Sequence, residues 1–363
     1  MRAGAAGQVG GEGGGSGAGW AIRAGAALVL SALALGLAAA APAPAAATAT
    51  TPAADSAETW YAAPTLKRLF RSHTSYEFGN PLDRRVSPLS RLEFPLNSWW
   101  GGVRLGARGP RLGLELEFLA ALHGQDDIGT MRDSDWDDEN HTRVKTIYSE
   151  SHTKLKESFT LDAKAAFSLR EDLGLPAWLD LRPLLGVRWQ RFTLVTHDGW
   201  QQQLEADPAS PEGLAWGDYQ PLPGDGIWFR QQYVHAYAGL MLTADLGRLG
   251  LGGPDRPGSG WQVSLQGDLA QVWGDNLDRH LLRAGNRETR ERTQGYAWHT
   301  ALSLRAPLWS WGSLTLTGDY LFIRTTGEHN LTDDAHGIDF TFDYGVMVWS
   351  QQMSLSLALE IPF

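Results

Sequence analysis

Hydrophobic and polar residues alternate along most of the chain after about residue 70. Because neighbouring side chains of a β-strand point to opposite faces, a period of two predicts strands that are apolar on one face. No stretch after residue 70 shows a convincing helical period. The C-terminal stretch is the clearest strand, and the apolar residues of its alternation are Met353, Leu355, Leu357, Leu359, Ile361 and Phe363.

The alternation predicts ten strands, and most are longer than the five or six residues that are common in globular sheets. An even number of long strands is typical of bacterial outer-membrane barrels. The sequence therefore predicts an all-β fold, a ten-stranded antiparallel transmembrane β-barrel. A large β-sandwich is the soluble alternative, and its strands would be shorter. The predicted strands are residues 72–78, 88–105, 111–122, 153–169, 177–196, 227–246, 260–274, 295–308, 313–326 and 344–363.

The predicted connections alternate between short and long. Short turns follow the second, fourth and eighth strands, whereas long polar segments follow the third, fifth, seventh and ninth. Outer-membrane barrels have short periplasmic turns and longer extracellular loops, so the pattern predicts long extracellular loops here. The connection at 247–259 departs from the pattern, since it is long but falls on the short side. The 16 tryptophans lie near the ends of alternating runs, which fits aromatic girdles at the membrane interfaces.

The N-terminal segment has the three parts of a secretory signal peptide. Arg2 and Arg23 precede a continuous apolar run at 24–41. Ala-rich sequence with several Ala-X-Ala cleavage motifs follows this run. A transmembrane anchor is the alternative, because the run approaches the length of a spanning helix. The absence of cysteine excludes a lipid-modified N-terminus. We expect a signal peptide at 1–47, a disordered lead at 48–69 and the barrel at 70–363.

Two short acidic motifs are candidates for chemistry. Asp133-Ser134-Asp135 lies in the predicted loop 129–151 after the third strand, and Asp278-Arg279-His280 follows the seventh strand. Residues i and i+2 of a strand share a face, so each motif presents two titratable groups side by side. Connections after odd-numbered strands lie at the same mouth of a barrel, and strands four apart lie nearly across a ten-stranded lumen. We therefore expect Asp133 and Asp135 to face Asp278 and His280 across the barrel.

These four side chains suit the activation of water. Two neighbouring carboxylates repel, so one of them tends to keep a proton near neutral pH. Asp278 would stabilise the imidazolium form of His280, which would take a proton from water while the aspartates hold the water and the oxyanion. The alternative is an ordinary acidic loop, since Asp126, Asp127, Asp137, Asp138 and Glu139 are also there.

Other ligand classes find little support. The net charge of −10 argues against nucleic acid, which calls for a basic face. Single, scattered histidines show no metal-ligand spacing. Asp133, Asp135 and Asp137 match the first ligands of a calcium loop, but Asp138 replaces its glycine and Val144 its closing glutamate. We therefore predict no metal site.

The two motifs, with the sequence at 129–136 and 278–280, resemble those of the omptins, the ten-stranded outer-membrane aspartyl-type proteases of Gram-negative bacteria. Residues 72–77, 85–89 and 229–240 are similar to other parts of that family. The resemblance implies endopeptidase activity without a cofactor, near basic residues. It implies Asp133, Asp135, Asp278 and His280 as catalytic residues, Glu77 as a carboxylate for a basic substrate side chain, and Asn276 in place of a second pocket carboxylate.

The resemblance also implies partners and a location. Omptins lie in the cell outer membrane with the site outside, act on peptides or proteins, and need lipopolysaccharide as an activator. Their basic lipid-binding positions fall at His197 and Gln232 here, with Arg188, Arg191 and Arg230 nearby as possible substitutes. Two alternatives remain open at this point: a barrel of the same fold with a surface-binding or structural role, and a passive pore.

Overall fold

The computed structural model describes residues 59–138, 142–210, 213–249, 260–283, 285, 287–309 and 312–363. The predicted signal peptide at 1–47 and the first part of the predicted lead lie outside these residues. In the described chain all regular structure is β, and no helix is long and apolar enough to cross a membrane. The strands are β1 (Thr59–Phe78), β2 (Ser90–Pro95), β3 (Trp99–Arg108), β4 (Leu112–Ala121), β5 (Thr130–Asp135), β6 (Ile147–Leu155), β7 (Phe159–Phe167), β8 (Leu179–Ala206), β9 (Leu214–Trp216), β10 (Gln220–Asp245), β11 (Gln262–His280), β12 (Glu288–Trp309), β13 (Gly312–Asp333), β14 (Ile338–Phe342) and β15 (Met347–Pro362).

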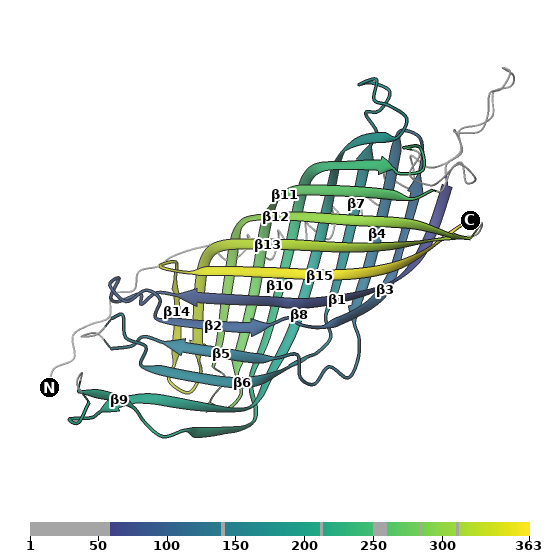
Figure 1. Ribbon diagram of the computed structural model, residues 1–363. Helices are drawn as coiled ribbons and strands as arrows, with labels where there is room; N and C mark the ends of the chain where they lie inside the picture. The colour runs from purple at the N-terminus through teal and green to yellow at the C-terminus, as the bar shows by residue number, and fades with distance from the viewer. Residues whose placement is uncertain are drawn as a thin grey trace, which may run out of the picture.

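The strands form one closed antiparallel ring with ten positions (Figure 1). Seven positions are single strands, namely β1, β8, β10, β11, β12, β13 and β15. The other three are each made by two strands in line, β3 with β2, β4 with β5 and β7 with β6. Pairing of β1 with β15 on one side and with β2 and β3 on the other closes the ring. The predicted ten-stranded barrel is therefore confirmed, with β9 and β14 as additional strands beside β8 and β13.

The three interrupted positions are neighbours in the ring, and their breaks lie side by side. Hydrogen bonds outside the regular ladder join the breaks. The backbone N–H groups of Leu96, Leu122 and Leu155 donate to the backbone carbonyls of Ser72, Trp99 and Gln125, respectively. On the adjacent β1, Arg71 has a φ of 51° and the register with β15 shifts. An extra residue in one strand bends and twists a sheet locally. The wall formed by β1 to β7 therefore bends at one height, which alternation in sequence did not predict.

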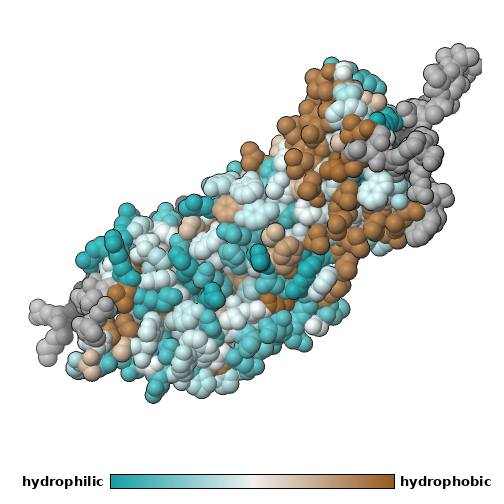
Figure 2. All heavy atoms as spheres, viewed as in Figure 1, coloured by the Kyte–Doolittle hydropathy of each residue, from teal (hydrophilic) through white to brown (hydrophobic). Residues whose placement is uncertain are grey.

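Exposed apolar side chains gather at one end of the barrel, where β3, β4 and β7 lie (Figures 1 and 2), and we call them the apolar belt. Its exposed side chains alternate with inward-facing polar ones, as on β15, where Ser354 and Ser356 are buried. Lipid-facing apolar bands of this kind are characteristic of transmembrane barrels. The belt includes Leu66, Val103, Leu105, Phe118, Leu185, Leu240, Leu242, Leu265, Leu269, Leu302, Leu316, Met353, Leu355 and Leu357.

The barrel extends far beyond this belt. Strand β8 has 28 residues, which at about 3.3 Å each span about 90 Å, whereas the apolar core of a bilayer is about 30 Å thick. The polar end opposite the belt, which we call the site end, carries β2, β5, β6, β9 and β14 (Figures 1 and 2). Much of the sequence predicted as long loops is therefore strand, because the wall continues past the membrane instead of ending there.

The barrel also begins earlier than predicted. We expected a disordered lead as far as residue 69, but β1 begins at Thr59. In this stretch Tyr61, Ala63 and Thr65 are buried, while the alternate residues Pro64 and Leu66 are exposed. The alternation is present but weak, because small residues and a proline replace the usual large apolar ones.

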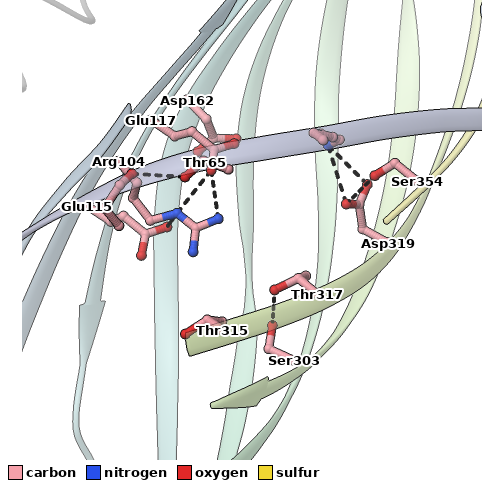
Figure 3. A network of polar contacts seen from close by, with 12 residues as sticks. Thr65, Arg104, Glu115, Glu117, Asp162, Ser303, Thr315, Thr317, Asp319 and Ser354 are labelled. Atoms are coloured by element: carbon pink, nitrogen blue, oxygen red, sulfur yellow. Dashed lines mark hydrogen bonds and ion pairs between the residues drawn. The ribbon is translucent and has the colours of Figure 1, made fainter. Parts of the chain in front are cut away.

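Ion pairs and hydrogen bonds line the lumen at the level of the belt (Figure 3). Arg104 binds Glu117 with a 2.6 Å N–O distance, and Lys164 lies 2.9 Å from Glu115. Asp319 accepts a hydrogen bond from Ser354 at 2.6 Å. Buried charges need such partners, since an isolated ion in a low-dielectric interior is strongly destabilising.

An apolar core lies between this polar network and the site end. Leu69, Phe94, Trp100, Phe192 and Phe229 are all almost completely buried within it. Phe94 and Phe229 stack face to face across the interior with ring centroids 4.3 Å apart. In the described chain, packed side chains therefore close the lumen, which argues against a passive pore.

Candidate functional site

Asp133 and Asp135 lie on the same face of β5. The structure places them in a strand and not in the predicted loop, since β5 pairs with β2 on one side and β6 on the other. Leu92 is the partner of Asp133 and Ser90 the partner of Asp135 on β2. Ladder hydrogen bonds on both sides therefore hold the two carboxyl groups in a rigid wall, which favours precise placement.

Asp278 and His280 lie at the C-terminal end of β11. Asp278 is nine residues, or about 30 Å along the strand, from the belt residue Leu269. Asp278 is fully buried, and its Oδ2 lies 3.6 Å from His280 Nε2. This distance allows an electrostatic interaction but exceeds that of a good hydrogen bond. Tyr76 of β1 donates a short hydrogen bond to the same Oδ2. Asp278 is thus held from across the barrel while it faces the imidazole.

One cavity at the site end brings the aspartate pair of β5 together with His280, while the buried Asp278 lies next to His280 and outside the described lining. The cavity has a volume of about 430 Å³, and Asp133, Asp135 and His280 all line it. Strands β5 and β11 are not neighbours in the ring, so the pairs come from different parts of the wall. Oδ1 of Asp133 and Oδ1 of Asp278 are buried without a hydrogen-bond partner among the described residues. Buried acceptors of this kind are available to a water molecule or a substrate.

The electrostatics separate the roles of these groups. Burial raises the pKa of Asp133 well above its ordinary range, and the charges of Asp135 and Asp278 raise it further. Burial also raises the pKa of Asp135. Burial lowers the pKa of His280, although the charge of Asp278 opposes this effect. Near neutral pH the site therefore favours a neutral imidazole opposite an aspartate pair that retains a proton.

Glu77 does not join the other predicted residues. It lies on the face of β1 opposite to Tyr76, and its Oε2 accepts a hydrogen bond from Arg91 Nε at 2.8 Å. The described lining of the cavity includes Tyr76 but not Glu77. The alternation of the predicted strand 72–78 could have shown that Glu77 faces outward, because Thr74 and Tyr76 share the inward face.

Asn276 does lie beside the site. It is buried, it shares a face of β11 with Asp278, and it pairs across the ladder with Glu291 of β12. Sequence reasoning missed Glu291 and its partner His329, whose Nδ1 lies 2.8 Å from Glu291 Oε1. Both are almost completely buried, and His329 stacks against Phe78 with centroids 4.2 Å apart. Only the register of β11, β12 and β13 brings these residues together.

The basic residues near the expected lipid-binding positions point in different directions. Arg188 points inward and binds Asp162 at 2.6 Å. Arg191 lies on the outer face of β8, opposite Gln232 of β10. Arg230 lies on the same outer face, and its Nη2 is 3.8 Å from Asp275. Arg191 and Arg230 therefore remain candidates for an outer-wall contact, whereas Arg188 belongs to the lumen.

Within the described residues, no group of three or more His, Cys, Asp or Glu side chains is arranged to hold a metal ion.

Comparisons with known proteins give a fold but no family. No protein-family model and no curated protein sequence matches the chain. Among solved structures, the outer membrane protease OmpT from Escherichia coli aligns with a TM-score of 0.67 and 16% identity, over 84% of this chain and 97% of OmpT. The translocator domain of the autotransporter NalP from Neisseria meningitidis aligns over 93% of this chain at 9% identity, but with a TM-score of only 0.29. The chain therefore has a barrel fold like that of OmpT.

Proposed function

We propose that this protein is an outer-membrane endopeptidase that hydrolyses peptide bonds with an activated water molecule. The observation that carries the proposal is the cavity lined by the aspartate pair of β5 and by His280 of β11, whose Nε2 lies 3.6 Å from the buried carboxyl group of Asp278. The likeness in fold to OmpT, which is an outer membrane protease, supports it. The cavity lies at the end of the barrel beyond the apolar belt, where polymeric substrates have access.

In this mechanism His280 is the general base. Its Nε2 faces Asp278, so Nδ1 is the atom that takes a proton from water. The water oxygen bonds to the carbonyl carbon, and the proton shared by Asp133 and Asp135 hydrogen-bonds to the developing oxyanion. Asp278 stabilises the imidazolium. When the C–N bond breaks, His280 returns its proton to the leaving amine, and the products are a carboxylic acid and an amine.

We place the protein in the cell outer membrane with the cavity facing the exterior. The belt supplies the lipid-facing surface, and the longer polar part of the barrel would project from the cell. Lipopolysaccharide is the proposed activator, carried over from the omptin resemblance, and Arg191 and Arg230 on the outer wall would contact its anionic groups.

The preference for basic residues, which the resemblance implies, has less support. Such a pocket uses a free carboxylate to bind arginine or lysine. Glu77 instead binds Arg91, and Asn276 is neutral. Glu291, the ladder partner of Asn276, already interacts with His329. We therefore propose the peptidase activity without a basic preference.

The test is cleavage of a fluorogenic peptide library by the purified, folded protein, with and without lipopolysaccharide. We expect cleavage by the parental protein and a loss of about a hundredfold or more in D133N and H280A. E77Q is the matched control, because Glu77 lies outside the cavity, and it should keep its activity. Cleavage that persists unchanged in D133N and H280A would disprove the site. No cleavage by any form would favour the non-proteolytic barrel.

A further inference from the structure

Two arginines line the cavity beside the proposed base. Arg283 and Arg287 lie between β11 and β12, and both contribute to the cavity wall together with His280. The backbone carbonyl of Arg287 accepts a hydrogen bond from the backbone N–H of His280 at 3.1 Å. The position of Arg287 is thus tied directly to that of the histidine.

Neither arginine forms an ion pair with any residue that the structure describes. Nε of Arg287 is buried and lacks a hydrogen-bond partner within the described chain. The two guanidinium groups repel, and burial followed by the charge of Arg283 lowers the pKa of Arg287. The charges of Asp333, Asp278 and Asp135 oppose this effect only from a distance. Arg287 is half-buried and Arg283 is exposed, and an anion that contacts both guanidinium groups would reduce the repulsion between them.

The carboxyl groups in the described lining of the cavity already have other roles or partners. The carboxylates that line it, Asp133, Asp135 and Asp137, include the proposed catalytic pair. Asp137 accepts a short hydrogen bond from Thr146. The lining also includes apolar side chains, among them Leu331, Phe340 and Phe342. Such a lining suits the methylene groups of a side chain whose charged end reaches the arginines.

We propose that Arg283 and Arg287 form a subsite for the carboxylate side chain of an aspartate or glutamate next to the scissile bond. This inference rests on the proposed peptidase function and specifies its substrate class. Guanidinium groups bind carboxylates through paired hydrogen bonds, so the two arginines select charge and also fix the position of the peptide. The subsite reverses the charge preference that the family resemblance implies.

The test uses three peptide series that differ only by Glu, Gln or Lys at each position around the cleaved bond. At one position we expect kcat/KM for Glu to exceed that for Gln by about tenfold or more, because a charged hydrogen-bonded pair is lost. R283Q and R287Q should remove this difference, and the double variant R283E/R287E should favour Lys. R279Q is the matched control, since exposed Arg279 binds Glu288 at 2.8 Å and does not line the cavity.

Three results would overturn the proposal. Equal cleavage of Glu and Gln peptides would show that no carboxylate is selected. An equal loss for every peptide in R283Q and R287Q would show that the arginines only balance the aspartates. If the parental protein cleaves nothing, the subsite can be tested by binding alone. Fluorescence anisotropy then measures the affinity of labelled Glu and Gln peptides for the parental protein and for R287Q. Tighter binding of the Glu peptide, lost in R287Q, would then support the subsite although the peptidase proposal had failed, and equal binding would disprove it.

Discussion

The phenol of Tyr76 on β1 donates a hydrogen bond to Oδ2 of Asp278 on β11, across the interior of the barrel. Both residues are buried, and His280 Nε2 approaches the same oxygen. Tyr76 also stacks on Phe229 with ring centroids 5.6 Å apart, which fixes the direction of its hydroxyl. The tyrosine therefore determines which way the carboxylate faces, although it does not touch the substrate in our proposal.

Removal of this hydroxyl tests the relationship. We expect Tyr76→Phe to lower kcat about tenfold or more with little change in KM, because a buried charged acceptor loses its donor. The matched control is Tyr148→Phe, whose hydroxyl bonds to Glu150 away from the cavity. A variant whose kcat and pH profile both equal those of the parental protein would contradict a positioning role.

The pH dependence of cleavage should be bell-shaped. His280 must be neutral to accept a proton, and burial lowers its pKa below the ordinary value of 6.5. The rate should therefore rise with pH through a value below 6.5 and fall when the aspartate pair loses its shared proton. Initial rates across the pH range measure both limbs. A single limb rising above pH 6.5 would contradict the assignment of His280.

The pH at which the cleavage rate falls, on the high-pH side of the bell-shaped profile, should depend on Asp135. The charge of Asp135 helps to raise the pKa of Asp133, so Asp135→Asn removes repulsion and lowers that pKa. Asp133 then loses its proton at lower pH, and the fall in rate should move to lower pH together with a reduced maximum. Asp137→Asn serves for comparison and should shift the limb less. An upper limb that stays in place would show that the aspartates do not share a proton.

The Glu291–His329 pair should make the stability of the site end depend on pH. Burial raises the pKa of Glu291 in the folded protein, so folding favours its protonated form. The contribution of Glu291 to the free energy of unfolding is fully present below its ordinary pKa of 4.5. This contribution is lost as pH rises through the raised pKa of the folded protein. We expect Glu291→Gln to reduce this loss, measured by heat-dependent gel mobility at about pH 5 and about pH 8. Glu288→Gln, at an exposed ion pair, should leave the loss unchanged.

Close packing of Tyr237 over Gly186 should be essential for barrel stability. A Cβ at Gly186 would lie 2.2 Å from Cζ of Tyr237, so the ring would have to move away from its hydrogen bond to Asp162. We expect Gly186→Ala to destabilise the barrel by about 1–3 kcal/mol. At Gly267 a Cβ meets nothing within 4 Å, so Gly267→Ala is the control. Thermal unfolding in detergent compares the two, and equal midpoints would disprove the packing argument.

Local alternation was sufficient for much of the fold, because strand direction depends on neighbouring residues. The last strand shows this best, since Met353, Leu355 and Leu357 face outward in the belt as their period of two predicts. The same rule predicted that Asp133 and Asp135 share a face, as Asp278 and His280 do. It did not predict the breaks near Leu96, because backbone hydrogen bonds between distant segments cause them.

The sequence by itself determined the ten strands and the two pairs of titratable residues, since both follow from spacing along one strand. Only the tertiary structure decided what surrounds those pairs. Tyr76 and not Glu77 faces Asp278, and Glu291 meets His329 through the register of three strands. Arg287 lines the cavity from the connection between β11 and β12. These contacts join residues far apart in the chain, so they depend on closure and register of the barrel, which no local pattern encodes.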